Sequence, residues 1–174
     1  MTAAVSRVTL VEGEDFKLRP GRESDRNLVL DSWIKCHRRN CYPEKRCKHY
    51  GACSCPQILD AESYRAGQEW LVKQLLERCA LYVACLPSEE DFVMAWSVTS
   101  DRAVHYCWTR HAFRRKGLCN ALLKPYLGKP TTYTHPVSVG ADWMGSKWSV
   151  PEGFVFDPFH AYRIAAFPKP RDNA

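Results

Sequence analysis

Long apolar runs are missing from this sequence: none approaches the ~18 residues that a membrane-spanning helix needs. Its start, MTAAVSRVTLVEGED, has no basic region followed by an apolar core of about 7–15 residues, so we expect no secretory signal. We also find no internal repeat, low-complexity tract or domain linker. These absences predict one soluble, cytoplasmic domain. At 174 residues it is long enough to bury a core without metal or disulfide staples.

Paired C-x-x-C motifs are also missing, although the chain has nine cysteines. In an intracellular chain, so many cysteines indicate metal binding or buried thiols rather than a disulfide framework. Cys41, Cys47, Cys53 and Cys55, with Cys36, His37 and His49 nearby, could supply four zinc ligands. Reduced thiols in a loop are the alternative. Cys79, Cys85, Cys107 and Cys119 lie in expected helices or strands and are predicted to be small buried side chains.

Acidic residues are nearly missing from the segment 35–50, KCHRRNCYPEKRCKHY, where Glu44 stands against six lysines and arginines. The segment therefore carries +5 of the formal net charge of +6. Such a local charge indicates an anionic partner, such as nucleic acid, a nucleotide or a phosphorylated ligand. The candidate substrate-binding residues are Arg38, Arg39, Lys45, Arg46 and Lys48. A solvated basic loop without a partner is the alternative.

The apolar spacing predicts an α/β (α+β) domain with a mixed central sheet. A strand at 16–19 ends at Pro20-Gly21, and a helix capped by Ser24 or Asp25 runs to about Cys36. An irregular Cys-rich basic loop is expected over 36–56 and a second helix over 60–79. Strands follow at 80–86, 91–100 and 103–110, a short helix after Gly117, and strands in TTYTHPVSV and in FVFDPFHAYRIAAF.

The segment 104–123, VHYCWTRHAFRRKGLCNALL, gathers positive charge where a strand is expected to meet a helix. The first turn of a helix leaves backbone N–H groups unpaired, and the helix dipole adds partial positive charge. Gly117 lets the backbone approach a ligand closely, and Arg114, Arg115 and Lys116 add full charges. This combination predicts a phosphate or pyrophosphate site. A basic turn that binds nothing is the alternative.

Arg114-Arg115-Lys116-Gly117-Leu118-Cys119 resembles the acyl-CoA-binding motif of the GNAT (Gcn5-related N-acetyltransferase) superfamily, R/Q-x-x-G-x-G/A. Cys119 stands where that motif has glycine or alanine. The expected order of elements over about 16–162 is similar to the superfamily as well. Thr134-His135 and Phe156-Asp157-Pro158-Phe159 further resemble small uncharacterised bacteriophage GNAT-like proteins, which implies a phage-encoded protein acting in the host cytoplasm.

The resemblance implies an acyl-CoA-dependent N-acyltransferase, with acetyl-CoA as the expected cofactor. Its cofactor-binding residues would be Trp108, Thr109, Arg114, Arg115, Lys116, Gly117, Leu118, Cys119 and Asn120. His105 stands where the family often has a carboxylate base on the central strand, and it could serve as base or simply pack in the sheet. Tyr133, Tyr162 and Tyr126 are candidate general acids, and His135 is a further catalytic candidate.

A non-catalytic binder remains open at this point. In that alternative, a degenerate GNAT scaffold carries a basic module, stabilised by zinc, that contacts nucleic acid or protein.

Overall fold

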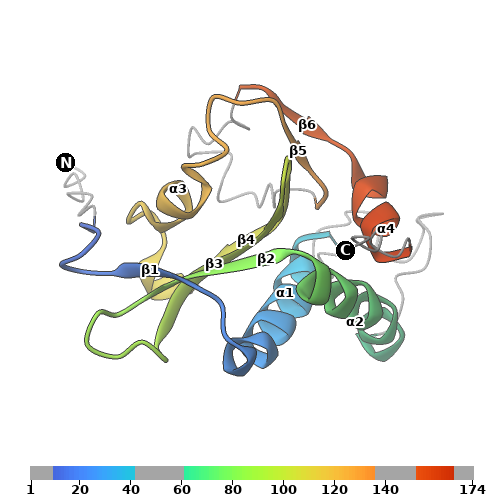
Figure 1. Cartoon of the computed structure of the whole chain (residues 1–174). Coiled ribbons are helices and arrows are strands. Elements are labelled where there is room, and N and C mark those ends of the chain that lie inside the picture. Colours follow the sequence, from blue (N-terminus) through green and yellow to red (C-terminus); the bar gives the residue numbers. More distant parts are fainter. Residues whose placement is uncertain (1–9, 42–60, 136–151, 167–174) are drawn as a thin grey trace, which may run out of the picture.

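The computed structural model describes residues 10–41, 61–135 and 152–166 (Figure 1). The strands are β1 (Lys17–Pro20), β2 (Ala80–Cys85), β3 (Val93–Ser100), β4 (Ala103–Thr109), β5 (Thr131–Tyr133) and β6 (Phe154–Phe156). The α-helices are α1 (Arg26–Cys41), α2 (Ala61–Arg78), α3 (Leu118–Leu123) and α4 (Pro158–Ala166), and single 3₁₀ turns lie at η1 (Glu23–Asp25) and η2 (His111–Phe113). In this part of the chain, no helix is both long and apolar enough to cross a membrane.

The six strands form one mixed sheet in the order β1-β2-β3-β4-β5-β6. Strands β1 to β4 pair antiparallel, whereas β4 with β5 and β5 with β6 pair parallel. Helices α1, α2 and α4 lie on one face of the sheet and α3 lies on the other (Figure 1). This arrangement confirms the predicted α/β class, with a mixed sheet and helices on both faces.

Apolar side chains form a separate core on each face of the sheet. On the α1–α2–α4 face, Trp33 from α1 packs on Trp96 from β3, with ring centroids 5.6 Å apart. Both indoles are completely buried, which makes them the largest contributors to that core. On the other face, Leu118 and Leu122 of α3 pack against Met94 and Ala95 of β3. The short helix α3 is thus anchored to the sheet directly beside the basic turn that precedes it.

The first helix is longer than the spacing predicts. We expect an irregular loop from Cys36, but α1 continues to Cys41. Residues 36–41 contain neither glycine nor proline, and Pro43 is the first residue able to stop the helix. His37 also hydrogen-bonds Tyr64 of α2, which holds this turn against its neighbour. The predicted loop 36–56 is therefore wrong for its first six residues, and 42–56 lies outside the described residues.

The predicted final strand is also wrong beyond Phe156, because the chain turns into α4 there. Asp157 Oδ1 accepts hydrogen bonds from the backbone N–H groups of Phe159 and His160, at 3.0 and 3.2 Å. Asp157 is thus an N-cap and Pro158 occupies the first helical position, where its missing N–H costs nothing. This Asp-Pro start is a helix signal that outweighs the β-propensity of the aromatic residues around it.

A buried ion pair joins the first strand to the first helix. Both Arg19 terminal nitrogens donate to Asp25, at 2.6 and 3.0 Å, and each side chain is less than 10% exposed. Burial alone would raise the pKa of Asp25, but the hydrogen bonds from Arg19 and from the Arg22 backbone N–H outweigh it and lower the pKa. Arg19 also donates to the Glu90 carbonyl at 2.9 Å, which ties β1 to the β2–β3 connection.

We expect Asp25→Ala to lower the free energy of unfolding by about 3–5 kcal/mol, because it leaves a buried guanidinium without its counterion. Urea titration at pH 7 measures the loss. The matched control is Glu23→Ala, which removes a carboxylate that is 83% exposed and should cost less than about 1 kcal/mol. Because the pKa of Asp25 is lowered, its contribution is present above the unfolded-state pKa of about 3.9 and disappears as the pH falls through the folded value. Equal losses in the two variants would contradict this role.

Candidate functional site

Strand β4 carries a β-bulge at His105. Val104 is opposite Thr99 of β3 and Tyr106 is opposite Val98, so His105 has no partner residue in the ladder. A bulge bends its strand and changes which backbone groups face outward. Before the bulge, the carbonyls of Arg102 and Val104 accept from Thr132 and Thr134 on the β5 side, at 2.8 and 3.2 Å.

Beyond the bulge, the β5-side edge of β4 is open among the described residues. The register with β5 ends at the pair Val104 and Tyr133, while the ladder with β3 continues to Thr109. The Arg110 N–H donates to the Met94 carbonyl at 2.9 Å, so in the alternating antiparallel pattern Cys107 and Thr109 direct their backbone groups away from β3. Thr109 was predicted to face a ligand here together with Trp108, but the ladder assigns that edge to Cys107 and Thr109 instead.

The turn that follows β4 presents a run of unpaired backbone donors. Among the described residues, no hydrogen bond uses the N–H groups of residues 115–120. Arg115 and Gly117 both have left-handed backbones, with φ of 64° and 90°. Such alternation turns successive N–H groups toward one side of the chain, as in anion-binding nests. The Lys116 carbonyl faces Leu10 and not the side of the unpaired N–H groups, because it accepts a hydrogen bond from the Leu10 N–H at 3.1 Å.

Basic side chains surround this turn, and they do not form hydrogen bonds with its backbone N–H groups. Arg114 and Arg115 are exposed, and Arg114 Nε donates to the Thr109 carbonyl at 3.3 Å at the end of β4. Lys116 Nζ lies 5.5 Å from the centre of the Phe113 ring. The turn and the open edge of β4 are therefore adjacent, and the turn has the donors and charge to hold a phosphate or pyrophosphate group. The predicted residues 114–120 and Thr109 come together in one place.

Two of the predicted small buried cysteines meet beside this turn. Cys107 Sγ of β4 and Cys119 Sγ of α3 are 3.0 Å apart, and Thr109 Oγ1 lies 3.3 Å from Cys119 Sγ. Both cysteines are only partly buried. The side chain at position 119 therefore packs against β4 instead of projecting into the turn, which is how a residue larger than glycine or alanine is accommodated there.

A cluster of histidines occupies the opposite face of the sheet, where β4 and β5 begin to separate. Thr134 Oγ1 lies 3.1 Å from His105 Nδ1 and 3.0 Å from His135 Nδ1, and His105 Nε2 lies 3.2 Å from Ser100 Oγ. The His135 ring packs edge-on against His37 of α1, with centroids 4.9 Å apart. The predicted residues His105 and His135 are thus linked through one hydroxyl group.

Burial keeps these imidazoles neutral. It lowers the pKa of His37 and of His105 to about 4, with a contribution from His160 in the case of His105. The pKa of His135 falls to about 3 because it is buried and faces His37 and His105. His105 is 1% exposed and both of its ring nitrogens lie beside hydroxyl oxygens. Any proton that it takes up has to arrive through Thr134 or Ser100.

The remaining predicted site residues lie on other elements or outside the described residues. Tyr133 is half-buried and packs on Phe156, with ring centroids 5.1 Å apart, and Tyr162 is 49% exposed on α4. Arg38 and Arg39 lie in the last turns of α1, with side chains outside the described part of the chain. Lys45, Arg46, Lys48, Cys47, Cys53 and Cys55 lie outside the described residues, and Cys41 ends α1. Among the described side chains, no group of three His, Cys, Asp or Glu could hold a metal ion.

Sequence reasoning missed the part that His37, Tyr64 and Thr134 play in the histidine cluster. His37 and Tyr64 come from the facing helices α1 and α2 and form a hydrogen bond. His37 lies four residues after Trp33 and so shares its buried helix face, which is the one signal that could have placed it next to the sheet. No sequence pattern indicates that His37 or Tyr64 lies near His135.

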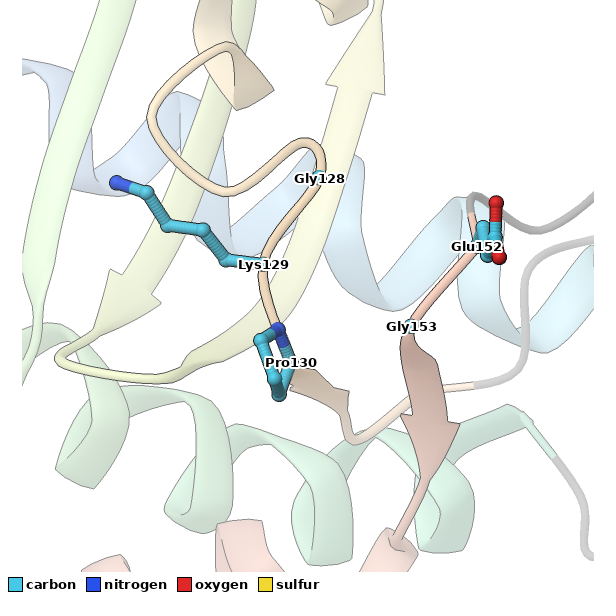
Figure 2. Close-up of a pocket in the computed structure, with 5 residues that line it drawn as sticks. All are labelled: Gly128, Lys129, Pro130, Glu152 and Gly153. Carbon is cyan, nitrogen blue, oxygen red and sulfur yellow. The ribbon is translucent and has the colours of Figure 1, made fainter.

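A pocket of about 380 Å³ opens at the start of β5 and β6, away from the basic turn (Figure 2). Gly128, Lys129, Pro130, Glu152 and Gly153 line it. Figure 2 shows the Lys129 and Glu152 side chains pointing away from each other, so no charged groups converge in it. Its walls are mostly backbone and proline, which offers little chemistry for recognising a substrate.

No family model and no curated protein matches this sequence. Four chains in solved structures do. A possible acetyltransferase from Clostridium difficile 630 is 20% identical with a TM-score of 0.40, over 64% of this chain and 68% of that one. The apo form of YjaB from Escherichia coli is 16% identical with a TM-score of 0.42, over 64% of this chain and 63% of YjaB. Both similarities are distant, and neither transfers an activity to this chain.

We expect the protein to lose stability between pH 6.5 and pH 4. The unfolded chain binds protons at its histidines near pH 6.5, whereas folded His37, His105 and His135 stay neutral to about pH 4 or below, so acid favours the unfolded state. Each such histidine should lower the free energy of unfolding by up to about 2 kcal/mol at pH 5. Urea titrations at pH 7, 6 and 5 measure the slope.

His105→Asn should flatten this pH dependence, whereas His111→Asn, which alters an exposed histidine, should leave it unchanged. The same slope in the His105 variant and the parent protein would contradict the assignment.

Proposed function

We propose that the protein is an acyl-CoA-dependent N-acyltransferase of the GNAT type, which transfers an acetyl group to an amine of an anionic or nucleic-acid-related acceptor. The observation that carries this proposal is the turn after β4, whose N–H groups at 115–120 are unpaired among the described residues. The resemblance of Arg114 and Gly117 to the acyl-CoA motif supports the same assignment. The related resemblance to phage proteins further suggests a phage-encoded enzyme.

The turn suits the pyrophosphate of acyl-CoA. Pyrophosphate is doubly charged and rich in acceptors, so it matches several convergent N–H donors with Arg114, Arg115 and Lys116 around them. Leu118, Cys119 and Asn120 contribute the last of these donors. Acetyl-CoA is the cofactor that we propose, since it combines this pyrophosphate with a thioester.

The open edge of β4 suits the pantetheine arm, which carries amide groups. The outward backbone groups of Cys107 and the Thr109 N–H can pair with those amides as another strand would. Laid along this edge from the turn toward the bulge, the arm would bring the thioester close to the histidine cluster. A backbone N–H of β4 would then polarise the thioester carbonyl while the amine attacks it.

Proton transfer has to accompany the attack of the amine on the thioester. We assign it to the His105–Thr134–His135 group, in which a proton from the attacking amine passes to a hydroxyl group and on to a ring nitrogen. At neutral pH these imidazoles are unprotonated, and their depressed pKa values also make them weaker proton acceptors than a free histidine. Tyr133 and Tyr162 remain the candidate acids for the departing thiolate.

The basic segment 35–50 would select the acceptor. The helices on either side of it meet over the face of the sheet that carries Tyr106. The His37 and Tyr106 ring centroids are 6.4 Å apart, and Tyr64 near the start of α2 hydrogen-bonds His37. We therefore propose that the connection between α1 and α2, which lies outside the described residues, contacts the acceptor. Its +5 charge favours an anionic acceptor over a neutral or cationic one.

We expect acetyl-CoA to raise the melting temperature of the parent protein, because a ligand that binds only the folded state stabilises it. Gly117→Glu should weaken acetyl-CoA binding by at least about tenfold in calorimetry. It places a side chain at φ 90° and a negative charge against the pyrophosphate.

Gly67→Glu is the matched control for this change. It adds the same charge on α2, where nothing lies within 4 Å of the added Cβ, and acetyl-CoA affinity should not change. Absence of any acetyl-CoA binding by the parent protein would refute the proposed function.

Acceptors are best found by incubating the protein with labelled acetyl-CoA and a panel of amines of differing charge. With the best acceptor, the double variant Lys45→Glu, Arg46→Glu should raise KM by about tenfold and leave acetyl-CoA affinity unchanged. The control Arg102→Glu alters an exposed arginine on the β3–β4 turn and should not affect KM. An acceptor KM that is insensitive both to the double variant and to salt would contradict acceptor selection by this segment.

A further inference from the structure

Two thiols face each other between the sheet and the helix that follows the basic turn. Cys107 Sγ and Cys119 Sγ are 3.0 Å apart, which is already closer than an ordinary contact between sulfur atoms. A disulfide bond is about 2.05 Å long, so the two atoms need to approach by only about 1 Å. Cys107 belongs to β4 and Cys119 to the first turn of α3, so a bond between them would join two separate elements.

The surroundings shift the pKa values of the two thiols in opposite directions. The hydrogen bond from Cys107 is the largest cause that lowers the pKa of Cys119, with further contributions from Thr109 and from the positive charge of Arg114. The same contact and burial raise the pKa of Cys107. Cys119 is therefore the more readily ionised thiol of the pair. A thiolate next to a second thiol is the arrangement that disulfide exchange needs.

We propose that Cys107 and Cys119 form a reversible disulfide site that reacts with low-molecular-weight disulfides such as oxidised glutathione. Both cysteine residues are only partly buried, and we expect a small reagent to reach their thiols from solvent. The Cys119 thiolate attacks one sulfur of oxidised glutathione and releases the first glutathione. Cys107 then attacks the Cys119 sulfur, and its proton goes to the second glutathione as it leaves. Counted from the Cys119 thiolate and the Cys107 thiol, the protein loses two electrons and one proton, and oxidised glutathione leaves as one glutathione thiolate and one glutathione thiol.

The disulfide would act on the turn next to it, and this consequence rests on the proposed function. Drawing Cys119 toward β4 moves the first turn of α3 and with it the N–H groups of residues 118–120. It also removes the contact between Cys119 Sγ and Thr109 Oγ1, next to the open edge of β4. Both changes alter the surface assigned to acyl-CoA, so oxidation should weaken cofactor binding.

Peptide mapping tests the site without reference to any activity. The reduced full-length protein is incubated with oxidised glutathione, its remaining thiols are alkylated, and it is digested with trypsin. Arg110 and Lys116 lie between the two cysteines, so cleavage there places Cys107 and Cys119 on separate peptides. We expect these two peptides to be joined by a disulfide and to separate after treatment with dithiothreitol.

Two variants sharpen this test. Cys107→Ser should leave one glutathione attached to Cys119, because the second thiol is missing. Cys36→Ser, a matched change at another partly exposed cysteine, should leave the Cys107–Cys119 link intact. Recovery of Cys107 and Cys119 as unlinked alkylated peptides, while other cysteines react, would overturn the proposal.

Calorimetry with acetyl-CoA on reduced, oxidised and re-reduced protein tests the consequence. We expect affinity to fall by about tenfold on oxidation and to return on reduction, in the parent protein and in Cys36→Ser alike. Equal affinity in the linked and reduced forms would overturn the effect on cofactor binding. Failure of the reduced protein to bind acetyl-CoA would refute the proposed function alone, since the peptide map decides the disulfide separately.

Discussion

The β-bulge at His105 is the constraint on which the rest of the site depends. Up to Val104 the outward carbonyls of β4 are used by β5, and beyond the bulge the outward groups belong to Cys107 and Thr109. Among the described residues, the β5-side edge of β4 is thus paired before the bulge and open after it. The histidine that occupies the bulge is held by Ser100 and Thr134, so the change of register and the histidine cluster have a common origin.

Charge and backbone conformation act together in the turn that follows. Arg115 and Gly117 adopt left-handed backbones, which most side chains disfavour, and the first turn of α3 follows them. Among the described residues, the N–H groups of residues 115–120 have no partner. Arginine and lysine side chains add positive charge around these N–H groups, but the backbone conformation of the turn sets the direction in which the N–H groups point. Leu118 and Leu122 fix that direction by anchoring α3 in the core beside β3.

Much of this arrangement follows from local sequence. The alternation in β3 and β4 and the short SDR connection indicate a hairpin, and Gly117 after three basic residues indicates an anion-binding turn. The sequence predicts a strand in place of α4, because aromatic residues surround Asp157 and Pro158. The Asp-Pro pair is nevertheless a local helix signal, since Asp157 caps the helix and Pro158 begins it. The extension of α1 to Cys41 was missed because cysteine and basic residues are compatible with either a loop or a helix.

By itself, the sequence determined the α/β class, the position of the basic turn and the charge of the segment 35–50, because propensity, glycine and net charge are local properties. Only the tertiary structure decided that Cys107 meets Cys119 and that His37 meets His135. It also decided where β4 stops pairing with β5. These are contacts between residues distant in the chain, and they depend on strand register and helix packing, which no short stretch of sequence specifies.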